Sequence, residues 1–192
     1  MSGISTRNAV FDEKKLEWMN SQYLAQTPAD KLVPLVAAGF FEAGMLSPEW
    51  LAANRAYFTQ VVELLKGRMR RIPEFVEYGS YFFSEPVEYE AAAREKHWKA
   101  PETASWLETL AGRLSALSAF TADQAEATVR TYAEALGINA GKLIHPTRLA
   151  LTGFGVSPGL FEVMALLGKE KVAARLRRAA KLIADELIGV TE

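Results

Sequence analysis

Residues Ser47–Gly67 read SPEWLAANRAYFTQVVELLKG, and this stretch decides the fold class. Serine followed by proline is a typical start of an α-helix, because the serine side chain caps free N–H groups and proline suits the first turn. Apolar residues then recur at the helical period, namely Trp50, Leu51, Tyr57, Phe58, Val61, Val62 and Leu65. The stretch therefore predicts a long amphipathic helix that ends or bends at Gly67.

Helix signals continue on both sides of this stretch. Further start signals, each a capping side chain or a proline, are Asp12, Thr27-Pro28, Pro73 and the capping box Thr121-Ala122-Asp123-Gln124. They predict helices over residues 13–25, after Pro28, after Pro73 and up to Gly137, and the last helix is expected from about Lys169 to about Leu187. No segment alternates apolar and polar residues like a strand. We therefore expect an all-α protein.

Ser84-Glu85-Pro86 marks the expected boundary between two consecutive helical subdomains, residues 1–86 and 87–192. Proline cannot continue a helix, and the composition beyond it shifts to alanine, glutamate and lysine. We expect the two subdomains to form one helix bundle.

The composition is that of an ordinary globular protein, with 49% hydrophobic and 23% charged residues among 192. No apolar run is long enough for a membrane span, and no signal-peptide pattern opens the chain. The absence of cysteine excludes disulfides and agrees with a cytoplasmic protein. A formal net charge of −1 argues against a generic nucleic-acid binder, although positive charges cluster at 66–71 and 169–181.

Catalytic motifs are missing. No glycine-rich phosphate loop follows a strand, and neither His97 nor His145 has the Glu-x-x-His spacing of a di-iron bundle. Serine, histidine and aspartate form no nucleophile pattern either. We expect no catalytic residue, no metal site and no cofactor in this chain.

A second stretch, His145–Lys171, reads HPTRLALTGFGVSPGLFEVMALLGKEK. It places Arg148 before a Gly-Phe-Gly-Val loop, and Ser157-Pro158-Gly159 then opens another expected helix, with Ser157 as its N-cap. Free N–H groups at a helix start beside an arginine suit an anionic or acceptor-rich ligand.

This stretch resembles the C-terminal region of bacterial glutamyl-tRNA synthetases, whose pattern runs "LR-x-ALTG…PGLFE-x-x-x-LLGKE". Phe11–Leu24, FDEKKLEWMNSQYL, is similar to the "FD-x-x-KLEWMN-x-x-Y" stretch that opens the anticodon-binding half of the same enzymes. Both matches occur in the family's order, and the resemblance spans nearly the whole chain. It implies a piece of a longer enzyme that begins close to the start of that half.

The resemblance implies that two helical subdomains grip the anticodon loop of glutamate tRNA. The parent reaction would be the ATP-dependent attachment of glutamate to that tRNA. The HIGH-like and KMSKS-like motifs of the catalytic domain are absent here, so ATP and magnesium would bind elsewhere in the parent enzyme. The implied partners are glutamate tRNA and the catalytic domain, with no membrane, and we expect a monomer. The alternative is a free-standing helical module that binds RNA or protein without ligase activity.

The resemblance also assigns residues. Arg68 matches the family arginine that reads the third anticodon base and hints at discrimination against glutamine tRNA, although a slip of two residues would give this role to Arg70. Arg148 matches an arginine that reads the first or second base. Ser157 and Pro158 match a pair that touches the middle base, and Gly159 would permit close approach.

Two further sets complete the expectations. Phosphate contacts would come from Lys14, Lys15, Asn20, Arg70, Arg71, Arg175, Arg177 and Arg178, and they would position the RNA without specifying its sequence. The large apolar side chains Trp18, Trp50, Phe58, Leu160 and Phe161 are spaced as core residues of helices.

Overall fold

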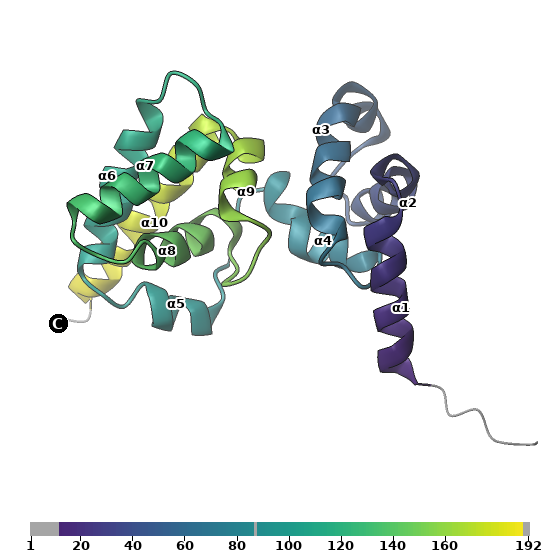
Figure 1. Ribbon diagram of the computed structural model, residues 1–192, viewed down its shortest axis with the longest axis horizontal. Coiled ribbons are helices and arrows are strands. Elements are labelled where there is room, and N and C mark those ends of the chain that lie inside the picture. Colours follow the sequence, from purple (N-terminus) through teal and green to yellow (C-terminus); the bar gives the residue numbers. More distant parts are fainter. Residues whose placement is uncertain (1–11, 87, 190–192) are drawn as a thin grey trace, which may run out of the picture.

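The computed structural model describes residues 12–86 and 88–189, and this part of the chain consists of helices and connections without a strand (Figure 1). The elements are α1 (Glu13–Gln26), α2 (Ala29–Glu42), α3 (Pro48–Lys66), α4 (Pro73–Gly79), the 3₁₀ helix η1 (Ser80–Phe82), α5 (Ala91–His97), α6 (Glu102–Ser115), α7 (Ala122–Ala135), α8 (Gly141–Thr152), α9 (Leu160–Leu167) and α10 (Lys169–Gly189). The predicted all-α class is confirmed.

Three of the predicted helix starts are capped as expected. Asp12 Oδ1 accepts a hydrogen bond of 3.1 Å from the backbone N–H of Lys15, and Ser47 Oγ accepts one of 3.2 Å from Trp50. Thr121 Oγ1 accepts one of 3.3 Å from Gln124. Each cap satisfies a donor that the helix itself leaves free, so these starts are fixed by neighbouring residues alone.

The helices gather into two groups that lie side by side (Figure 1). The first group contains α1 to α4, and α2 packs against α3. In the second group, α6 lies along α10 and α8 packs against both. The expected boundary at Pro86 falls in the connection between η1 and α5. The division into two subdomains remains a prediction.

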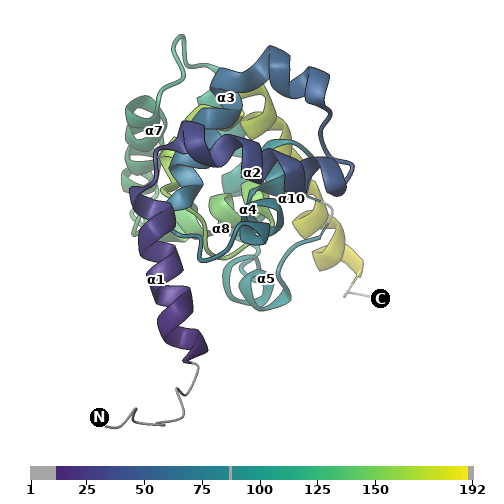
Figure 2. The same ribbon diagram turned by 90° about the vertical axis from the view of Figure 1, so that its right-hand side faces the viewer.

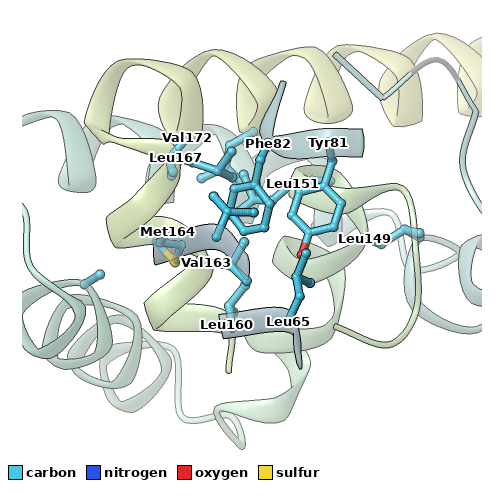
Figure 3. Packing of buried hydrophobic residues seen from close by; sticks show 14 of the residues in the cluster. Leu65, Tyr81, Phe82, Leu149, Leu151, Leu160, Val163, Met164, Leu167 and Val172 are labelled. Carbon is cyan, nitrogen blue, oxygen red and sulfur yellow. The ribbon is translucent and has the colours of Figure 1, made fainter. Parts of the chain in front are cut away.

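Two aromatic side chains of η1 join the groups. Tyr81 and Phe82 are both buried. Figure 3 shows the Phe82 ring among Leu167 and Val172 of the second group, beside Tyr81. The two groups therefore share one continuous hydrophobic core, which fixes the space between α4 and the loop after α8.

Arg175 of α10 lies in this shared interior and is only 2% exposed. Its Nη1 donates to Leu151 O at 2.7 Å, its Nη2 to Ser84 O at 2.9 Å, and its Nε to Glu85 Oε2 at 3.0 Å. The expectation that Arg175 contacts RNA phosphate is therefore wrong, because the guanidinium is covered and already satisfied. It ties α10 to α8 and to the connection between the groups.

Helix α1 projects from the first group (Figure 2). Leu24 near its C-terminal end is buried, whereas Trp18 is 63% exposed. Trp18 is thus not a core residue, because α1 packs only through its last turns. Phe58 and Leu160 are buried as expected, and Trp50 and Phe161 are half-buried. The uncovered apolar side chains of α1 also include Leu16, Met19 and Tyr23.

Gly153 ends α8 in the left-handed conformation, with φ 83°. A Cβ at this position would lie 2.8 Å from the carbonyl oxygen of Glu88. We expect Gly153→Ala to lower the free energy of unfolding by about 1–3 kcal/mol, because the conformation and the space both require glycine.

Gly112 of α6 is the matched control, since a Cβ there would meet nothing within 4 Å. Gly112→Ala should stabilise the protein by about 0.5–1 kcal/mol. Urea denaturation followed by circular dichroism measures both variants, and equal effects of the two substitutions would contradict this account.

His97 of α5 and His145 of α8 stack with ring centroids 4.7 Å apart. Burial lowers the pKa of His97, and the positive charges of His145 and Lys96 lower it further. Since the unfolded state then binds the proton more readily, stability should fall as the pH drops below about 6.5.

Unfolding curves at pH 7.5 and 5.5 test this dependence in the wild type and in a His97→Gln variant. The wild type should lose more stability between the two pH values than the variant. The same loss in both proteins would exclude His97 as its source.

Candidate nucleic-acid interface

A groove of about 1040 Å³ runs between the two groups of helices. The first group contributes Arg68 and Arg70, which follow α3. The second group contributes the loop after α8, including Ser157 and Pro158. The fold thus brings together residues that lie far apart in the chain and that the family resemblance assigned to one binding surface.

Arg148 of α8 lies behind the loop and is half-buried. Its Nη1 donates to Pro158 O at 2.8 Å and also contacts Ser157 Oγ. Within the described part of the chain, the hydrogen bonds of this guanidinium all come from Nη1, and none is formed by Nε or Nη2. Burial lowers the pKa of Arg148, and the positive charge of Arg68 lowers it further.

The expected helix start at Ser157 is wrong. Helix α9 begins at Leu160 with Gly159 as its N-cap, and Ser157 Oγ instead donates to Pro158 O at 2.8 Å. A Cβ at Gly159 would collide with the carboxylate of Glu162. The space at Gly159 thus accommodates that carboxylate, which places negative charge at the helix start. Ser157 and Pro158 are buried, and Ser157 Oγ and Pro158 O both accept from Arg148 Nη1.

Arg68 and Arg70 differ in their surroundings. Arg70 forms an ion pair with Glu17 of α1 at 3.6 Å, and its backbone N–H donates to Glu74 Oε2 at 2.6 Å. Arg68 is exposed and has no ion pair within the described ranges. Its charge also acts on Arg148. Of the two candidates, Arg68 is the better placed to contact a ligand together with Arg148.

The other residues predicted to contact phosphate either lie outside this groove or already bond to other groups of the protein. Lys14 and Lys15 are exposed on α1, whereas the Asn20 amide donates to Arg70 O. Arg71 pairs with Glu74 at 3.4 Å, and Arg177 with Glu108 at 3.5 Å. A neighbouring cleft of about 550 Å³ is lined by the basic side chains of Arg94, Arg178 and Lys181.

Sequence reasoning missed an aromatic pair in the groove. Tyr78 of α4 and Phe154 of the loop after α8 lie with ring centroids 5.5 Å apart. Tyr81 is a further unexpected feature, because its buried hydroxyl has no hydrogen-bond partner in the described structure. Figure 3 shows this hydroxyl turned toward Leu65, which lines the groove. No local pattern marks either feature, since both depend on contacts between the two groups.

Among the described residues, no group of three or more histidine, cysteine, aspartate or glutamate side chains could hold a metal ion. In the same residues, no helix is both long and apolar enough to span a membrane.

Comparison with known proteins identifies the family. A family model described as an anticodon binding domain matches residues 29–180 and runs across Pro86 without a break. The chain belongs to this anticodon-binding domain family. The domain is 40% identical over 185 residues to a glutamate–tRNA ligase of Moorella thermoacetica and 39% identical over 181 residues to one of Desulforudis audaxviator.

These relatives are much longer than the anticodon-binding domain. The matches cover 96% and 93% of this chain but only 38% and 36% of the two ligases. A solved glutamate tRNA ligase from Elizabethkingia meningosepticum superposes with a TM-score of 0.77 at 28% identity, over 90% of this chain and 33% of that one. A glutamate-tRNA synthetase structure from Elizabethkingia anophelis gives a TM-score of 0.70 at 26% identity, over 89% and 32%.

Proposed function

We propose that this chain recognises the anticodon loop of glutamate tRNA as part of a glutamate–tRNA ligase. The observation that carries the proposal is the groove lined by Arg68 of one helix group and by Ser157 and Pro158 of the other, with Arg148 bonded to Pro158 O directly behind it. Proteins that read RNA sequence splay out unpaired loop bases and bond to their exposed edges. A groove between two rigid helix groups suits that task, because bases can enter from the open side.

Arg148 and Arg68 are the proposed reading side chains. An arginine fork can donate two hydrogen bonds to acceptors on one base edge, such as O2 and N3 of cytosine. Arg148 is held at Nη1 by Pro158 O, and in this proposal Nε and Nη2 would donate to the base. Ser157 and Pro158 would act mainly by fixing this arginine next to the middle base. Arg68 would read the third base.

The parent enzyme supplies the chemistry in this proposal. ATP, magnesium and glutamate would bind in a catalytic domain outside this chain, consistent with relatives of which the chain covers only 38% and 36%. Leu16, Met19 and Tyr23 leave one face of α1 apolar and uncovered, and we propose that the rest of the enzyme packs there. The parent would act as a cytoplasmic monomer.

Phosphate contacts would add affinity without sequence preference. Lys14, Lys15, Arg71 and Arg178 are exposed and remain candidates for such contacts. Their contribution should weaken as salt rises, because each contact releases bound counterions.

Binding measurements with glutamate tRNA and with a version carrying a scrambled anticodon test the proposed function. We expect tighter binding to the natural anticodon at matched salt concentration. Equal affinity for both RNAs would exclude anticodon reading. Absence of RNA binding would instead favour a module that binds protein.

A further inference from the structure

We propose that Tyr78 and Phe154 form a preformed platform on which one unpaired base of the bound RNA stacks. This inference rests on the proposed function and adds to it a contact that no arginine supplies. The two rings come from opposite helix groups and meet at 5.5 Å with an interplanar angle of 59° inside the groove. Stacking on aromatic rings is a general way to hold single-stranded bases, since every base has a π-face.

The platform presents apolar surface to solvent. Tyr78 is 40% exposed, and Val156, which also lines the groove, is 73% exposed. Tyr81 and Phe82, which join the same helix groups, are buried. Buried aromatic rings thus already connect the groups, and Tyr78 remains partly exposed beside them. A partly exposed aromatic ring beside an exposed valine can be covered by a flat, largely apolar ligand.

The loop that carries Phe154 is held rigidly. The N–H of Phe154 donates to Thr152 Oγ1 at 3.1 Å, and the N–H of Gly155 donates to Glu90 Oε2 at 2.8 Å. The N–H of Glu90 donates back to Gly153 O at 2.8 Å. Because these bonds fix the loop from within the chain, stacking a base on Phe154 would require little further ordering of the loop.

The charges in the groove favour a base over a phosphate. Four carboxylates line it together with Arg68 and Arg70, and they belong to Glu74, Glu77, Glu88 and Glu90. A phosphate close to these carboxylates would be repelled, whereas an uncharged base would not. The backbone of the RNA should therefore pass outside the groove while a base points into it.

Fluorescence of 2-aminopurine tests the platform directly. The probe is placed at each loop position in turn of an anticodon stem–loop, and the full chain is added. We expect strong quenching at one position with the wild type. Tyr78→Leu and Phe154→Leu should abolish this quenching and raise Kd for the unlabelled RNA about 5-fold or more. Tyr78→Phe and Phe154→Tyr keep an aromatic ring at each position and should retain the quenching and the wild-type Kd.

Phe120→Leu is the matched control, since this half-buried phenylalanine precedes α7 and does not line the groove. It should leave quenching and Kd unchanged. Melting curves establish that each variant is folded, and exposed Tyr78 provides a second test if Phe154→Leu unfolds. Wild-type quenching and Kd in both folded leucine variants would overturn the platform.

Failure of the platform can be distinguished from failure of the proposed function. If Arg148→Ala still weakens RNA binding while the leucine variants bind like the wild type, anticodon reading stands and the platform falls. If the wild type shows no preference for the natural anticodon but the leucine variants still abolish quenching, the platform stands as an RNA contact and anticodon reading falls.

Discussion

Replacing Arg175 by methionine is expected to lower the free energy of unfolding by about 2–4 kcal/mol. The substitution keeps an apolar stem but removes the donors to Leu151 O and Ser84 O. Buried carbonyl groups left without a donor are costly, and the shorter side chain leaves a cavity. Because these bonds tie α10 to α8 and to the connection between the helix groups, the loss should affect the whole domain. Urea denaturation followed by circular dichroism measures it.

The ion pair with Glu85 should contribute much less than the backbone contacts. The Glu85 side chain is 55% exposed, so water can solvate it when its partner is lost. We expect Glu85→Gln to cost less than about 1 kcal/mol. If Glu85→Gln destabilised as much as Arg175→Met, the ion pair and not the carbonyl contacts would be the source of stability.

Substitution of Arg148 by alanine is expected to weaken binding of glutamate tRNA by about 1–3 kcal/mol and to relax selectivity at one anticodon position. Two effects combine. The base loses the donors that the guanidinium would offer it, and Pro158 O loses one of its two donors, so Ser157 and Pro158 are held less firmly. Titrations with RNAs that differ at single anticodon positions measure both the affinity and the selectivity.

Two variants separate reading from general attraction. Arg148→Lys retains the charge but lacks the planar fork, so it should lose selectivity while recovering part of the affinity. Arg71→Ala removes an exposed charge that pairs with Glu74 at 3.4 Å. This substitution should lower the affinity slightly and by the same factor for every RNA tested. An unchanged selectivity profile in Arg148→Ala would contradict the assignment of this residue.

The predictions from sequence succeeded where a feature depends on neighbouring residues. Asp12, Ser47 and Thr121 cap their helices as expected, because the capping oxygen and the backbone N–H that donates to it lie only three residues apart. Ser157 failed the same rule. Its hydroxyl is used by Pro158 and by Arg148, which approaches from another helix, and the start of α9 moves to Leu160.

Burial was harder to predict than helix position. Arg175 lies in a positively charged run, and such runs are usually solvated, but the connection between the groups supplies acceptors that draw this one residue inside. Trp18 shows the opposite error, since its helical spacing suggested a core position that α1 does not provide. The pairing of Tyr78 with Phe154 depends on how the two groups dock, and no local pattern encodes that arrangement.

The central claim is that the groove between the helix groups holds the anticodon. A glutamate tRNA carrying 4-thiouridine in the anticodon loop, irradiated in complex with the chain and mapped by mass spectrometry, tests this claim most directly. We predict crosslinks to the groove-lining residues within segments 65–78, 88–91 and 153–158. Crosslinks only on α1 or on the outer face of α10, or an identical pattern from a thiouridine in the acceptor stem, would contradict it.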